Sequence, residues 1–132
     1  MARNAGAAWA SIQWRPRKLG RTHMFTASGW RSGRDTANPK LGLRIGVADR
    51  DKYFHRAWTI VRLRLPGGYG VAVVNLRPSF WREHPELRSS EINAWLRGTG
   101  AFPWPRGRPP RYRVRADGGG LFTVGGRVAS PL

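Results

Sequence analysis

Arginine is the most informative residue type for function in this sequence of 132 residues. Lys and Arg together number 24 against 7 Asp and Glu, and only Lys18, Lys40 and Lys52 are lysines. A guanidinium group is planar, so it can bind phosphate through two parallel hydrogen bonds and can stack on a flat ring. Because the formal net charge is +17, we expect a polyanionic partner, and nucleic acid fits this chemistry best.

The clearest arginine pattern is Arg111, Arg113 and Arg115, which alternate with Tyr112 and Val114. Side chains two residues apart on a strand share one face and lie ~6.6 Å apart. The pattern therefore predicts three guanidinium groups on one face of a strand, with the tyrosine and the valine in the core. Like charges repel one another, so such a stripe favours an anionic partner. A merely solvated charged face is the alternative.

A second arginine pattern lies in a strand expected over residues 57–65. There Arg62 and Arg64 share one strand face with Trp58. Charge that follows a phosphate backbone, together with a ring that stacks on a base, is the arrangement that holds a single nucleic-acid strand. The alternative is that Trp58 covers an edge of the sheet or packs against the N-terminal segment.

Two further tryptophans stand beside arginines. Trp104 lies in a rigid Pro-Trp-Pro context next to Arg106 and Arg108, although it could equally be a hydrophobic plug that pins its loop to the core. Trp14 lies beside Arg15 and Arg17. The expected phosphate contacts are thus Arg15, Arg17, Arg62, Arg64, Arg106, Arg108, Arg111, Arg113 and Arg115, and the expected stacking residues are Trp14, Trp58 and Trp104.

A catalytic alternative rests on His55, Arg56 and Tyr53, which could supply the acid, the base and the cation of a small basic ribonuclease. Isolated histidines are more often structural, so the pattern favours a binding protein over an enzyme, and the question stays open. The carboxylates show no spacing typical of a metal-dependent nuclease, and there is no cysteine. We expect no metal and no cofactor.

Alternating apolar residues predict the elements that must position these side chains. The expected strands cover residues 41–48, 57–65, 69–76, 111–116 and 121–124, and a further short strand is expected at 24–27. Residues 49–52 read as a polar turn. One helix is expected over residues 91–97, capped by Ser89 or Ser90 and followed by Gly98.

This order predicts an α+β fold, a small curled antiparallel sheet or barrel of about five strands with one helix between strands three and four. The order is OB-like; an SH3-like barrel and an open sheet are alternatives, and a winged helix fits less well. We divide the chain into a basic, partly irregular arm (1–40), a single domain (41–125) and a short tail (126–132).

The sequence therefore predicts a nucleic-acid-binding protein, with DNA slightly favoured over RNA because no group is identified that would read a 2′-hydroxyl. The alternatives are a toxin-like ribonuclease and a structural component of a nucleoprotein particle. No Walker, GxGxxG, HExxH or helix-turn-helix signature is present. With no secretory signal and no long apolar run, we expect a cytoplasmic protein without membrane contact. Two copies could pair through an edge strand.

Overall fold

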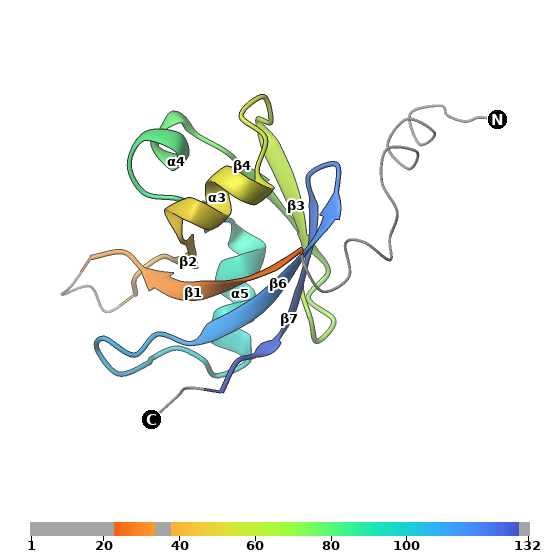
Figure 1. Ribbon diagram of the computed structural model, residues 1–132. Coiled ribbons are helices and arrows are strands. Elements are labelled where there is room, and N and C mark those ends of the chain that lie inside the picture. The colour runs from red at the N-terminus through yellow and green to blue at the C-terminus, as the bar shows by residue number, and fades with distance from the viewer. Residues whose placement is uncertain (1–22, 34–37, 130–132) are drawn as a thin grey trace.

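The computed structural model describes residues 23–33 and 38–129 and shows a small α+β fold (Figure 1). Within these ranges the chain forms seven strands and three helices. The strands are β1 (Met24–Arg31), β2 (Leu41–Ile45), β3 (Ile60–Arg64), β4 (Val71–Asn75), β5 (Glu86–Arg88), β6 (Arg111–Gly118) and β7 (Leu121–Arg127). The helices are α3 (Val47–Tyr53), α4 (Pro78–Arg82) and α5 (Ser90–Gly98).

The seven strands make one strongly curled sheet in the order β4-β3-β7-β6-β1-β2-β5 (Figure 1). All neighbouring strands are antiparallel except β3 and β7, which pair in parallel. The two edge strands, β4 and β5, approach each other at the open side of the curl. The sheet is therefore a nearly closed barrel with a seam between β4 and β5.

Side-chain alternation along the strands separates a buried inner face from an exposed outer face. In β3 and β4 every second residue is buried, and β6 begins with the same pattern. Apolar residues on the inner faces form one core: Phe25, Ala27, Leu43, Ile45, Val61, Leu63, Ala72, Val74, Tyr112, Val114, Phe122 and Val124. This confirms that the alternating segments of the sequence build a core from one face of each strand.

Helix α5 packs against the inner side of the curl. The Ser89 hydroxyl accepts a hydrogen bond from the Ile92 amide at 3.0 Å, so Ser89 is the N-cap that starts the helix. Trp95 is buried, and its ring centroid lies 4.6 Å from that of Tyr112 on β6. The predicted helix over residues 91–97 is confirmed, extended by one residue at each end.

The structure has more elements than the sequence predicts. Seven strands exceed the expected five, and three helices replace the expected one. Residues 47–53 are helical, so the expected strand ends at Ile45 and the expected turn at 49–52 is wrong. The apolar alternation extended through Val47, but Val47 is 52% exposed and contributes nothing to the core. Strand β5 has only three residues, which is too short for a periodic signal.

Strand β1 lies within the segment that the sequence assigns to a partly irregular arm. The expected short strand at 24–27 is present, but it continues to Arg31 and pairs with β6 on one side and β2 on the other. Its buried residues are Phe25, Ala27 and Gly29, and the residues that alternate with them are partly buried. The sheet consequently begins well before residue 41.

Candidate functional site

The five arginines predicted on strands β3 and β6 all lie on the outer face of the sheet. Arg62 and Arg64 are exposed on β3, with Val61 and Leu63 buried between and beside them. On β6 the stripe of Arg111, Arg113 and Arg115 is exposed in the same way. We call these five residues the arginine face.

Strand pairing joins the two arginine sets across β7. Thr123 is the register partner of Arg64 on β3 and of Arg115 on β6. The row Arg64–Thr123–Arg115 therefore crosses three neighbouring strands, which are ~4.8 Å apart. Thr123 is the one residue between Arg64 and Arg115 in this row, so the arginines of β3 and β6 lie on one outer face of the sheet.

One carboxylate partly neutralises this surface. Asp117 accepts hydrogen bonds from Arg115 Nε at 2.6 Å and from the Thr123 hydroxyl at 2.5 Å. Among the described residues, the ion pairs engage Arg44, Arg50 and Arg115. Within that part of the chain, the other four residues of the arginine face, Arg62, Arg64, Arg111 and Arg113, thus carry charge that no ion pair balances.

The expected stacking residues are less exposed than the arginines. Trp58 is half-buried just before β3, where its ring contacts Phe54 and Phe122 edge-on. Trp104 is only 9% exposed and packs edge-on against Phe102, as the plug alternative predicts. Trp104 is therefore placed to pack its loop against the core, whereas Trp58 is only partly buried.

The other expected contacts divide into two groups. Arg106 and Arg108 are exposed in the loop that precedes β6, away from the strand pairing that orders the arginine face. Trp14, Arg15 and Arg17 lie outside the described residues. The arginine face is thus the part of the predicted interface whose geometry the fold defines.

The residues of the catalytic alternative have separate packing roles. Tyr53 stacks on Phe25 with ring centroids 5.0 Å apart. Arg56 lies over the Trp81 ring at 4.8 Å. His55 Nδ1 accepts a hydrogen bond from the Ala57 amide at 3.1 Å. Each of these three side chains thus has a local contact within the fold.

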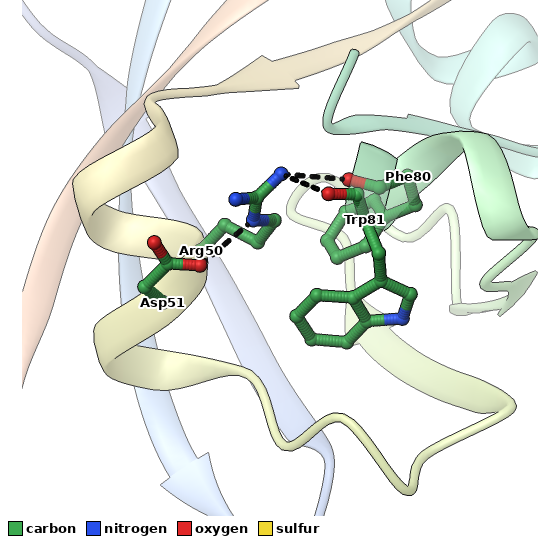
Figure 2. A network of polar contacts seen from close by, with 4 residues as sticks. All are labelled: Arg50, Asp51, Phe80 and Trp81. Carbon is green, nitrogen blue, oxygen red and sulfur yellow. Dashed lines mark hydrogen bonds and ion pairs between the residues drawn. The ribbon is translucent and has the colours of Figure 1, made fainter. Parts of the chain in front are cut away.

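Arg50 is a buried arginine that serves the fold. It is 7% exposed, and its Nη1 donates to the backbone carbonyls of Phe80 at 3.2 Å and Trp81 at 2.9 Å (Figure 2). The last carbonyls of a helix lack partners within the helix. Arg50, held by Asp51 at 3.0 Å, therefore caps α4 from α3 and joins the two short helices.

A second candidate site lies at the seam of the barrel, in a cleft of about 590 Å³. We call it the seam cleft. Four basic side chains line it, those of Lys40, Arg77, Arg88 and Arg97, together with His84. Six lining residues are polar and neutral: Asn38, Asn75, Ser79, Ser89, Ser90 and Asn93. Its one carboxylate, Glu86, is paired with Arg44, which lies outside the cleft.

Two of the cleft's guanidinium groups are held by neighbouring groups. Arg97 donates to the Pro39 carbonyl and, from Nε, to Asn93 Oδ1 at 3.4 Å. The Arg88 guanidinium lies over the Trp30 ring, 5.2 Å from its centroid. Arg97 is thus held by residues of the cleft itself, whereas the Arg88 guanidinium contacts Trp30, which lies outside the lining.

Sequence reasoning missed every residue of the seam cleft. Its cations are scattered between residues 40 and 97 and show no common periodicity. The pairing of β5 with β2 and the approach of β4 to β5 bring them together.

The described part of the chain has no group of three or more His, Cys, Asp or Glu side chains that could hold a metal ion. It also lacks a helix long and apolar enough to cross a membrane. Comparison with known proteins finds no matching family model, no matching curated protein and no matching solved structure.

Proposed function

We propose that this protein binds nucleic acid through its arginine face, with contacts to the phosphate backbone. The observation that carries the proposal is the row Arg64–Thr123–Arg115, which makes one surface of two arginine-bearing strands. Guanidinium groups bind phosphate oxygens in a planar, two-pronged geometry. Contacts of this kind position a nucleic acid without reading its sequence.

The charge balance of the face supports a polyanionic ligand over a merely solvated surface. Among the described residues, one of its five arginines has a carboxylate partner, Asp117. The rest repel one another unless an anion lies between them. A phosphate backbone relieves this repulsion and releases its own counterions, which makes binding favourable and dependent on salt.

Finer features of the predicted interface are part of the same proposal. Arg106 and Arg108 extend the face. Base stacking is assigned to Trp58 and to Trp14, and not to Trp104, because Trp104 is buried. The OB-like strand order stays a proposal. The arginine face does not depend on it, because the observed pairing of β3, β7 and β6 creates the face. DNA remains slightly favoured over RNA.

The test is a titration of nucleic-acid-free protein with single-stranded DNA, duplex DNA and RNA at several salt concentrations. The double variant Arg111→Ala/Arg113→Ala removes two unbalanced charges from the face. Each lost phosphate contact should reduce the slope of log affinity against log salt by about 0.7 to 0.9. We expect the slope to fall by about twice this amount and the fold to be unchanged, as circular dichroism would show.

The matched control is Lys52→Ala/Arg82→Ala, which removes the same charge from helices α3 and α4. If both double variants weaken binding equally, the net charge acts as a whole and the arginine face is not the site. Cleavage of the labelled RNA would instead favour the ribonuclease alternative. Negligible affinity for all free oligonucleotides would favour a component of a nucleoprotein particle.

A further inference from the structure

We propose that the seam cleft binds a phosphate monoester carried on a polar organic group, such as a sugar or a nucleoside. This site is separate from the arginine face and does not rest on the function proposed for it. Four basic side chains line the cleft, and the one carboxylate among its described lining residues, that of Glu86, is already paired with Arg44. Basic side chains therefore outnumber the acidic ones in the lining of the cleft.

The arrangement of the cations indicates a binding site for a compact anion. The alternative is a cluster of charged side chains that contacts only solvent. Arg88 is held on Trp30, and Arg97 is held by Asn93 and by the Pro39 carbonyl. Cations that are fixed before binding lose little freedom when a ligand arrives. Arg77 and Lys40 are exposed at the same cleft. They can close on the ligand from the ends of β4 and β2.

The size and the polar lining of the cleft set the class of the ligand. A volume of about 590 Å³ falls in the range of about 300 to 1,000 Å³ that is usual for small-molecule sites. A bare phosphate ion would leave most of it empty. The hydroxyls of Ser79 and Ser90 and the amide of Asn75 suit the hydroxyls of a sugar. One wall is apolar, formed by Pro39, Leu41 and Phe80.

The phosphate could be carried by a free sugar phosphate or nucleotide, or by the 5′ end of a nucleic-acid strand. Amide chemical-shift mapping on the full chain would compare ribose 5-phosphate, ribose, a nucleoside and its 5′-monophosphate. We expect only the phosphorylated compounds to shift the amides of residues 38–41, 75–80 and 84–97. Equal shifts with ribose and ribose 5-phosphate, or shifts confined to other regions, would overturn the proposal.

Variants then test which cations hold the phosphate. Arg77→Ala should weaken binding of the monophosphate by about tenfold or more, the usual effect of losing a charge-assisted hydrogen bond. The matched control is Arg82→Ala, on the same helix α4 but outside the cleft lining. If Arg82→Ala weakens binding as much, the cleft does not hold the phosphate.

Two further experiments distinguish a free monophosphate from a phosphorylated strand end, and the seam cleft from the arginine face. A short strand with a 5′-phosphate is compared with the same strand ending in a 5′-hydroxyl; a preference that Arg77→Ala abolishes identifies the strand end as a ligand. The double variant Arg111→Ala/Arg113→Ala should bind the free monophosphate with unchanged affinity. Loss of monophosphate binding in that variant would place the phosphate on the arginine face and would overturn the seam site.

Discussion

The Arg88 guanidinium lies over the indole ring of Trp30 because the residue between them, Gly42, has no side chain. Trp30 on β1 pairs with Gly42 on β2, and Gly42 pairs with Arg88 on β5. The cation lies 5.2 Å from the ring centroid, within the range of a cation–π interaction. An edge strand of three residues is thus tied across its neighbour to the interior strand β1, and the wall of the seam cleft is held in place.

Replacing Gly42 with alanine should disrupt this arrangement. A Cβ there would lie 2.6 Å from the Leu87 carbonyl oxygen and 2.9 Å from Arg88 Cγ. Because the first of these atoms is backbone, β5 must move, and we expect Gly42→Ala to destabilise the fold by about 1 to 3 kcal/mol in urea unfolding. Gly126→Ala is the control, since a Cβ at Gly126 has open space. Similar stability of the two variants would contradict the close packing of β5 against Gly42.

Removing the Arg50 side chain should destabilise the protein, although Arg50 itself belongs neither to the arginine face nor to the lining of the seam cleft. Arg50→Met keeps an unbranched side chain of some length but leaves the carbonyls of Phe80 and Trp81 without their donor. The expected loss is about 2 to 4 kcal/mol by thermal or chemical unfolding. Arg56→Met should cost much less, because Arg56 is exposed and only stacks on Trp81. A neutral Arg50→Met would show that water can replace the cap.

The stability of the protein should fall at high pH partly through Tyr112. Burial raises the pKa of the Tyr112 phenol above its ordinary value of 10.0, and the nearby Arg127 opposes this shift. The folded state then binds a proton more tightly than the unfolded chain. The resulting stabilisation is complete below pH 10.0 and is lost as the pH rises through the raised folded pKa.

The measurement is the free energy of unfolding of wild-type protein and of Tyr112→Phe at several pH values on both sides of the ordinary tyrosine pKa. The phenylalanine variant cannot ionise, so its stability should decline less over the alkaline range. Parallel declines in the two proteins would mean that other groups account for the whole effect.

Asp117→Asn should strengthen binding at the arginine face. The carboxylate is 17% exposed and engages Arg115 and Thr123, and asparagine keeps its shape while removing its charge. Freeing the Arg115 charge should raise nucleic-acid affinity a few-fold and steepen the salt slope by about 0.7 to 0.9. Glu83→Gln removes the same charge at the end of α4. An equal gain in that control would show that only the net charge matters.

Part of this structure could be predicted because it depends on contacts that are local in the chain. The outward direction of Arg62, Arg64 and the stripe on β6 follows from the two-residue period of a strand, whatever the strand packs against. The start of α5 follows from the Ser89 hydroxyl, which caps an amide three residues away. The cationic face could therefore be read from the sequence before any fold was known.

The remaining features depend on which distant segments meet, and no local pattern encodes that. The seam cleft exists because β5 pairs with β2 and because β4 and β5 approach each other; residues that lie far apart in the chain then line one cavity. Arg50 is buried because α4 ends above it with carbonyls that need a donor. Sequence periodicity determined which side of each strand is charged, whereas long-range pairing decided that a second cationic site would form between the strand ends.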